Sequence, residues 1–374
     1  MNQPSPQMDP RQQNLLARAM LLNTGIAMTK RIQPVTAAMG QNIQIPLQRM
    51  GIMTGVTLQF TCTPTWSAAP VANNVSLCAP FNLAKTVEYQ DFAGVKRTRT
   101  SGFQLWAGQA LKNADLSGTA NTKRNFVATQ DSNILNDGVA GGAGSPIYFS
   151  LYVPMAYDPS GDLTGAVLTQ TNVGEHFINV QLPSSLVGAD PWVFPFSAGT
   201  LNAGTDNVTV EAFQHYIQPQ QMSAATLPIL DLSTIYGFEG AYQTTANIAS
   251  GQPTYINYPN NRSILGTLIT YENNGVFTPN STDLGQITLL ANSNTNFREM
   301  TPRMLREQMR NILGADLPSN TFYIASRRQP ILTQLYANVQ AKMDVITANA
   351  GVTQFITQYE VQYPSGSPLP GITG

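Results

Sequence analysis

Charge is scarce in this chain. Only 11% of its 374 residues are charged, and 20 Lys and Arg against 21 Asp and Glu leave a net charge of −1, whereas about 25% charged residues is usual for a soluble domain. Without a basic excess, the composition does not indicate a nucleic-acid-binding protein. Because interface cores are depleted of charge, the composition favours a chain that buries much of its surface against other chains. A neutral secreted β-protein is the alternative.

Cysteines and long apolar runs are also scarce. The two cysteines, Cys62 and Cys78, do not make a disulfide framework, and two small buried thiols are favoured over a single bridge. No apolar run approaches the ~18 residues of a membrane-spanning helix. The first residues, Met-Asn-Gln-Pro-Ser-Pro-Gln, lack the basic and apolar segments of a secretory signal, so we expect synthesis in the cytoplasm.

The sequence motifs of common enzymes are missing. There is no Gly-x-Ser-x-Gly elbow, P-loop, dinucleotide-binding glycine pattern or His-Glu-x-x-His. The two histidines, His176 and His215, lie in strand patterns without carboxylate or thiolate helpers at metal-binding spacing. Asp158 and Asp162 could ligate calcium, but the Pro-Ser-Gly between them is ordinary turn chemistry. We therefore predict no catalytic residue, no cofactor, no metal and no enzymatic activity.

Strand-like alternation is what the sequence does contain. Residues 331–346 alternate between apolar and polar side chains, and as a single strand they would span roughly 50 Å, so we expect a bend near Asn338–Gln340. Turn residues separate further strand patterns, which indicates a β-sandwich or barrel. The expected strands are 56–63, 103–107, 147–153, 177–182, 208–217, 264–271, 287–291, 322–326 and 355–363.

The two halves of the chain follow a similar plan. Short helices are predicted at 163–169 and 301–313, each between groups of strands, which indicates a diverged structural duplication. The polar segment 218–225 lacks alternation and is the best domain boundary. Arg303, Arg306 and Arg310 share one face of the second helix, and Arg327 and Arg328 follow a strand. We interpret these arginines as solvated faces or inter-subunit ion pairs rather than nucleic-acid contacts, because interleaved aromatic residues are absent.

An amphipathic helix is predicted near the N-terminus. Asp9 suits the N-cap and Pro10 the first helical position, and Gly25 is a plausible end or kink. Its apolar stripe would be Leu15, Ala19, Leu22 and Ile26, and its basic neighbours are Arg11, Arg18, Lys30 and Arg31. We expect an arm packed on its own protein or on a neighbour, with contact to a membrane surface as the alternative.

Several segments, in order along residues 100 to 345, carry a resemblance to a known family. They are Ser101-Gly102 with Leu105, Tyr152-Val-Pro-Met-Ala-Tyr157, Asp162 to Leu168, Leu227 to Tyr236, Asn273 to Phe277 with Thr282-Asp283, the helix at 301–312, and Pro330 to Val339. In them the chain resembles the major capsid protein of tectiviruses, icosahedral phages with a membrane beneath the protein shell. The matching motif positions are Tyr152, Pro154, Asp162, Gly165, Asp231, Ser233, Tyr236, Asn274, Gly275, Pro330 and Tyr336.

The resemblance implies an all-β double jelly roll, with two eight-stranded β-sandwiches in one chain, short helices between strands and an N-terminal helix. The expected parts are an N-terminal arm at 1–40, a first jelly roll at 41–220, a second at 226–363 and a C-terminal arm at 364–374. The implied function is that of a structural major capsid protein. Its homotrimers, pseudo-hexagonal in outline, would tile an icosahedral shell around an internal membrane and a double-stranded DNA genome in the virion.

The resemblance also implies the partners. They are further copies of the chain, neighbouring trimers, vertex or penton proteins, minor capsid proteins and the internal membrane, without sequence-specific nucleic-acid binding. The residues expected to face the membrane or neighbouring capsomers are Asp9, Arg11, Leu15, Arg18, Leu22, Lys30 and Arg31. The alternatives are a phage spike or carbohydrate-binding β-sandwich module, which would expose an aromatic-lined patch, and a β-sandwich hydrolase, which would need paired carboxylates in a cleft.

Overall fold

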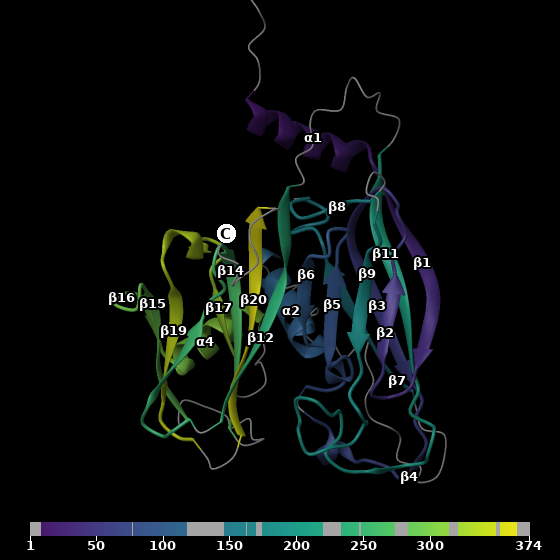
Figure 1. The fold of residues 1–374 in the computed structure, drawn as a ribbon, viewed down its shortest axis with the longest axis vertical. Coiled ribbons are helices and arrows are strands. Elements are labelled where there is room, and N and C mark those ends of the chain that lie inside the picture. Colours follow the sequence, from purple (N-terminus) through teal and green to yellow (C-terminus); the bar gives the residue numbers. More distant parts are fainter. Residues whose placement is uncertain are drawn as a thin grey trace, which may run out of the picture.

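Two β-sandwiches stand side by side, and helix α1 (Pro10–Thr24) lies across one end of the molecule (Figure 1). The computed structural model describes residues 9–76, 78–117, 146–161, 163–169, 174–219, 233–246, 248–273, 283–313, 321–348 and 352–364. The first sandwich uses the chain before residue 219 and the second uses the chain after residue 233, coloured green to yellow. The predicted all-β class is confirmed.

Three main sheets build these sandwiches. The first runs β1-β11-β3-β7, with β8 on β3, and comprises β1 (Ile26–Ala37), β3 (Ile52–Cys62), β7 (Ile147–Pro154), β8 (Val167–Leu168) and β11 (Val208–Gln218). A four-stranded sheet runs β13-β19-β15-β16, with β13 (Pro253–Asn257), β15 (Leu284–Ala291), β16 (Thr295–Met300) and β19 (Val339–Val345). Strands β4 (Trp66–Ala68) and β10 (Thr200–Leu201) form a small ribbon.

The third sheet has nine strands and passes through both sandwiches. Its order is β17-β14-β20-β12-β6-β5-β9-β2, with β18 on β14. The strands are β2 (Asn42–Pro46), β5 (Thr86–Gln90), β6 (Lys96–Thr100), β9 (Phe177–Gln181), β12 (Thr234–Ala246), β14 (Ser263–Asn273), β17 (Thr321–Ala325), β18 (Ile331–Leu332) and β20 (Val352–Pro364). The parallel pairing of β6 with β12 joins the two halves.

Close backbone approach makes this junction possible. Glu239 of β12 pairs with Arg99 of β6, and nearby Gly237 has no side chain. A Cβ atom at Gly237 would lie 1.7 Å from the carbonyl oxygen of Arg97, which no real side chain allows. Glycine is therefore required where the two sandwiches share a sheet.

Alternating burial explains the strands that the sequence pattern identified. Successive residues of β11 and of β7 alternate between buried and partly buried or exposed along most of their length, as expected for strands with one face on a core. In the first core Phe60 stacks on Phe149 with ring centroids 4.5 Å apart. A second apolar cluster, including Phe322 and Phe355, fills the other sandwich.

Helix α2 (Gly102–Ser117) is where a strand was expected at 103–107, and that prediction was wrong. Ser101 accepts the backbone N–H of Gln104 at 3.2 Å and caps the helix. Almost every described side chain of α2 is buried, because the helix lies between the two sandwiches (Figure 1). Over five residues, a helix buried on all sides has no periodicity that distinguishes it from a strand.

The helix predicted at 163–169 is also wrong, whereas the helix predicted at 301–313 is confirmed as α4 (Pro302–Leu313). Gly165 has a φ of +87°, outside the helical region, and the segment makes a turn before β8. In α4 the side chain of Thr301 accepts the backbone N–H of Met304 at 3.2 Å, and Pro302 takes the first helical position.

The long alternation at 331–346 breaks earlier than expected. Strand β18 ends at Leu332, a 3₁₀ turn follows at Thr333–Leu335, and β19 begins at Val339, so the turn precedes Asn338–Gln340. The cause is Thr333, whose buried hydroxyl is 2.8 Å from the carbonyl oxygen of Pro259 and accepts the backbone N–H of Arg262 at 2.9 Å. These bonds hold the chain in a turn that the apolar pattern does not reveal.

The proposed domain boundaries remain predictions. Most of 218–225 and of the C-terminal arm 364–374 lies outside the described residues. Strand β1 falls inside the predicted N-terminal arm and pairs antiparallel with β11. Within the described chain, no helix has the length and apolar character needed to cross a bilayer.

Candidate functional site: assembly surfaces

Helix α1 begins and ends where the sequence predicted. Asp9 precedes it, and its carbonyl oxygen accepts the backbone N–H of Gln13 at 3.0 Å. At the other end the Gly25 backbone N–H donates to Leu21 at 2.8 Å. A Cβ at Gly25 would lie 2.4 Å from the Ile217 side chain, so only glycine allows the chain to turn here into β1.

The face of α1 that packs differs from the predicted stripe. Ala17 and Leu21 are buried, whereas Ala19 and Ile26 are exposed and Leu22 is half-buried. Leu21 belongs to a small cluster with Ile52, Ala156, Leu163, Ala166 and Ile217. Arg18 donates to the hydroxyl of Thr164 at 2.5 Å. The helix is thus attached to the end of the first sandwich, through the turn that precedes β8.

The other predicted arm residues are spread over two elements. Asp9 is exposed, and the side chains of Arg11 and Leu15 lie outside what the structure describes, although both residues are in α1. Lys30 and Arg31 do not lie on the helix; they are exposed on β1, where Arg31 pairs with Glu211 of β11. Of the four predicted basic residues, Lys30 and Arg31 therefore belong to the sheet and not to the helix.

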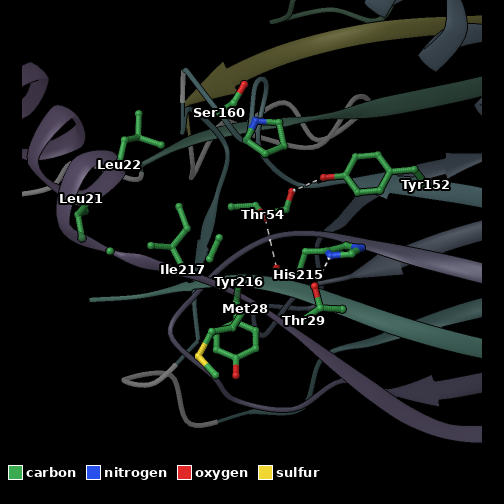
Figure 2. A pocket seen from close by; sticks show the side chains of 13 residues that line it. Leu21, Leu22, Met28, Thr29, Thr54, Tyr152, Ser160, His215, Tyr216 and Ile217 are labelled. Atoms are coloured by element: carbon green, nitrogen blue, oxygen red, sulfur yellow. Dashed lines mark hydrogen bonds between the residues drawn. The ribbon is translucent and has the colours of Figure 1, made fainter. Parts of the chain in front are cut away.

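A groove of about 550 Å³ opens where α1 meets β1 (Figure 2). Leu21, Leu22, Met28 and Ile217 give it an apolar side. On its polar side His215 lies 3.0 Å from the Thr29 hydroxyl and 2.8 Å from that of Thr57, and burial lowers the pKa of His215. Tyr152 donates to the carbonyl oxygen of Thr54 at 3.2 Å. This mixed lining can contact another chain or a surface, and its His215 and Tyr152 side chains already have partners within the protein.

A buried ionic network joins the two sandwiches beside the shared sheet. We call Lys112, Tyr157, Tyr236, Arg327 and Glu360 the junction network. Lys112 of α2 donates to the carbonyl oxygen of Tyr157 and, at 3.0 Å, to the Tyr236 hydroxyl of β12. The Tyr236 hydroxyl donates to Glu360 of β20 at 2.9 Å. Arg327 donates to the other oxygen of Glu360 at 2.6 Å, and their side chains are 5% and 2% exposed.

Cation–π contacts and charge complete the junction network. The Lys112 ammonium lies 4.6 Å from the ring centre of Tyr157 and 4.4 Å from that of Tyr236. Burial, and then the Glu360 carboxylate, hold the pKa of Tyr236 well above its usual value, so its hydroxyl stays protonated and donates. The network connects elements from both halves of the chain, and its geometry depends on how the two sandwiches are oriented.

Two of the family-motif positions meet at this junction. Tyr236 is in the network, and a Cβ at Gly165 would lie 2.4 Å from the Cβ of Tyr236. Tyr152 and Pro154 lie on β7, Ser233 directly precedes β12, and Pro330 and Tyr336 are exposed on either side of β18. Asp162, Asp231, Asn274 and Gly275 lie outside the described residues. Sequence reasoning found Tyr236 but missed Lys112, Arg327 and Glu360, which are far apart in the chain and belong to no local motif.

Other chemically notable side chains are buried and inert. Cys62 and Cys78 are free and buried, as expected, and burial raises the pKa of Cys62 to about 12. His176 is buried and stacked on Phe92 at 4.2 Å, and burial lowers its pKa to about 4. Among the residues that the structure describes, no group of three or more His, Cys, Asp or Glu could hold a metal ion.

Comparison with known proteins agrees with this architecture. A family model described as the P3 major capsid protein C-terminal matches residues 233–365. The major capsid protein P3 of Enterobacteria phage PRD1 is 26% identical over 349 residues, which cover 90% of this chain and 87% of that protein. The predicted resemblance is confirmed.

Solved viral structures share the fold. The major capsid protein of STIV superposes with a TM-score of 0.64 at 12% identity and covers 91% of this chain and 97% of that one. The PBCV-1 virus capsid gives 0.61 at 12% identity, over 94% and 98% of the two chains. At this identity the likeness establishes the fold alone. The predicted double jelly roll is confirmed, and the family matches indicate a structural, non-enzymatic role.

Proposed function

We propose that three copies of this structural major capsid protein form a homotrimer with a pseudo-hexagonal outline, because its fold is a double jelly roll and residues 233–365 match the P3 C-terminal family model. The observation that carries this proposal is the pairing of two sandwiches side by side in one chain (Figure 1). Three such chains around a threefold axis place six similar blocks in a ring, which can pack edge to edge. The chain is a virion component, and these trimers would tile an icosahedral shell.

The surface composition supports extensive burial against other copies. Charged residues are 11% of the chain, and exposed apolar side chains include Leu16, Ile26 and Met28 around α1 and the start of β1. Large assembly interfaces exclude charge from their centres. Neighbouring trimers, vertex proteins and minor capsid proteins are the proposed partners of these surfaces.

Helix α1 supports a second part of the proposal. It covers one end of the first sandwich, with Leu16 exposed and Leu21 buried beneath it. We place this end toward the interior of the shell, where an internal membrane encloses the double-stranded DNA genome. The exposed side of α1 would then contact the membrane surface or an adjoining trimer without crossing the bilayer.

Light scattering of the purified chain tests the trimer. The expected mass is three times the 40.5 kDa of one chain, at micromolar concentration. A species that stays monomeric at that concentration would count decisively against the proposed trimer.

Deletion of residues 1–24 tests the arm. This cut removes α1 and keeps β1, whose pairing with β11 begins at Ile26. We expect the trimer to persist while co-flotation with phosphatidylglycerol vesicles or particle assembly is lost. Normal flotation and normal particles from the deleted chain would refute the role of α1 and leave the trimer proposal standing.

A further inference from the structure

A second groove, with a cavity volume of about 870 Å³, lies on the second sandwich between β16, α4 and the turn that follows β17. We call it the arginine groove. Its lining residues are Leu289, Phe297, Arg298, Gln308, Asn311, Ala325, Ser326, Arg327, Arg328, Gln329 and Ile331. Among the residues that the structure describes, the lining has three arginines and no carboxylate, in a chain that otherwise balances its few charges.

Two of these arginines are fixed and the third is available. Arg298 donates to the carbonyl oxygen of Ala325 at 3.0 Å, and Arg327 is held by Glu360 in the junction network. Arg328 is exposed, and it makes no hydrogen bond or ion pair with any residue that the structure describes. A guanidinium presents a planar fork of donors that matches a carboxylate in two parallel hydrogen bonds.

Ser326 provides an independent indication of a ligand. Ser326 is one of the lining residues and is 5% exposed, and its backbone N–H donates to the carbonyl oxygen of Leu265 at 3.0 Å. Its hydroxyl has no partner among the described residues. Buried hydroxyls are normally satisfied, because an unpaired one loses its hydrogen bonds with water. An acceptor supplied by a bound molecule would satisfy it.

The remaining lining defines the class of ligand. Phe297 is 43% exposed, and Leu289 and Ile331 add apolar surface beside the cationic and amide groups. We propose that the arginine groove binds an acidic peptide segment of an adjoining protein of the shell, with carboxylates at Arg328 and Ser326 and apolar side chains at Phe297. This inference rests on the proposed function only for the origin of the segment, which is a protein of the proposed shell. Binding of the peptide requires a single trimer and no assembled shell.

Nucleic acid and lipid fit these observations less well. Within the described part of the lining, Phe297 is the only aromatic side chain, whereas single-stranded nucleic acid is bound by successive stacking platforms. A lipid surface would meet the end covered by α1, and α4 lies part-way along the second sandwich, away from that end (Figure 1).

Fluorescence anisotropy with the full-length protein tests the inference. The probe is a fluorescein-labelled peptide of alternating Glu and Leu, and the control peptide has Gln in place of Glu. We expect the acidic peptide to bind about tenfold more tightly than the neutral one, as one charge-assisted contact provides. Arg328→Gln should abolish most of this preference, whereas Arg303→Gln, an exposed α4 arginine outside the lining, should leave it unchanged.

Ser326→Ala separates ligand binding from folding. Because the hydroxyl is unpaired in the free protein, this variant should keep the thermal midpoint and bind the acidic peptide several-fold more weakly. Equal binding of the two peptides, or equal losses in the Arg328 and Arg303 variants, would overturn the proposal. So would tighter binding of a short single-stranded DNA or of phosphatidylglycerol vesicles at the same sites. All these measurements are made on trimer confirmed by light scattering, so a failure here is distinguishable from a failure to trimerise.

Discussion

Glu360→Gln is the most informative test of how the two sandwiches are held together. Glutamine preserves the size of the side chain and an acceptor for the Tyr236 hydroxyl, but Arg327 loses the carboxylate that it contacts at 2.6 Å. Breaking a buried ion pair costs about 3–5 kcal/mol, and the retained hydrogen bond places the expected cost near 3 kcal/mol. For a chain of 374 residues, 1 kcal/mol corresponds to about 1.3 °C, so the thermal midpoint should fall by about 4 °C.

An exposed ion pair of the same chain is the matched control. Arg310 and Glu307 are 3.5 Å apart on α4 with side chains 49% and 56% exposed, so Glu307→Gln should cost less than about 1 kcal/mol. The double variant Glu360→Gln with Arg327→Met removes both charges and should recover at least half of the loss, because no buried cation is left facing a neutral amide. Differential scanning calorimetry of the purified proteins supplies all the midpoints. Equal shifts for the buried and exposed variants, or strictly additive losses in the double variant, would refute the reasoning.

Three further predictions concern other parts of the fold. Burial lowers the pKa of His176 from 6.5 to about 4, so the unfolded state binds more protons than the folded state between these pH values. The free energy of unfolding should therefore fall by about 2 kcal/mol as the pH drops from 6.5 to 4. His176→Phe should flatten this decline in urea unfolding measured at several pH values, and an unchanged slope would contradict the role of His176. Gly237→Ala would place a Cβ 1.7 Å from a carbonyl oxygen of the neighbouring strand and should prevent folding to a soluble protein. Gly285→Ala, whose Cβ meets atoms at 3.6 Å, should be tolerated. Equal yields of soluble protein from the two variants would exclude the steric argument. Leu21→Ala removes a buried side chain, at a residue that is 1% exposed, and should make α1 more susceptible to limited proteolysis. Leu16→Ala, at a residue that is 45% exposed, should not change the cleavage rate. Equal cleavage of the two variants would show that the Leu21 contact does not hold α1.

Local sequence signals predicted the elements that have one buried face. Strands β7 and β11 were recognised from alternation alone, and α4 was predicted at 301–313, close to its observed bounds. Helix α2 was missed because it is buried on nearly every side, which removes the periodicity on which such a prediction depends. The turn at Thr333 was missed because a threonine in an alternating run reads as an ordinary strand residue.

The candidate surfaces were predictable only in part. The ends of α1 follow from a capping residue and a glycine, but the face that packs depends on the turn at Leu163–Ala166, which is distant in sequence. The junction network joins residues separated by up to 248 positions, from Lys112 to Glu360, so no spacing rule could assemble it. The resemblance to the capsid family provided the architecture, and the atomic contacts had to come from the structure.

The sheet that passes through both sandwiches has a mechanical consequence. Since β6 and β12 are neighbours in one nine-stranded sheet, and the side chain of Gln358 on β20 donates to Thr100 on β6 at 2.9 Å, the described parts of the two blocks are joined by a shared sheet and by a buried hydrogen bond. Each subunit should respond to load as a stiff plate. A closed shell made from such plates must obtain its curvature from the angles between neighbouring subunits, and pressure from within will strain those seams before it bends the chain itself.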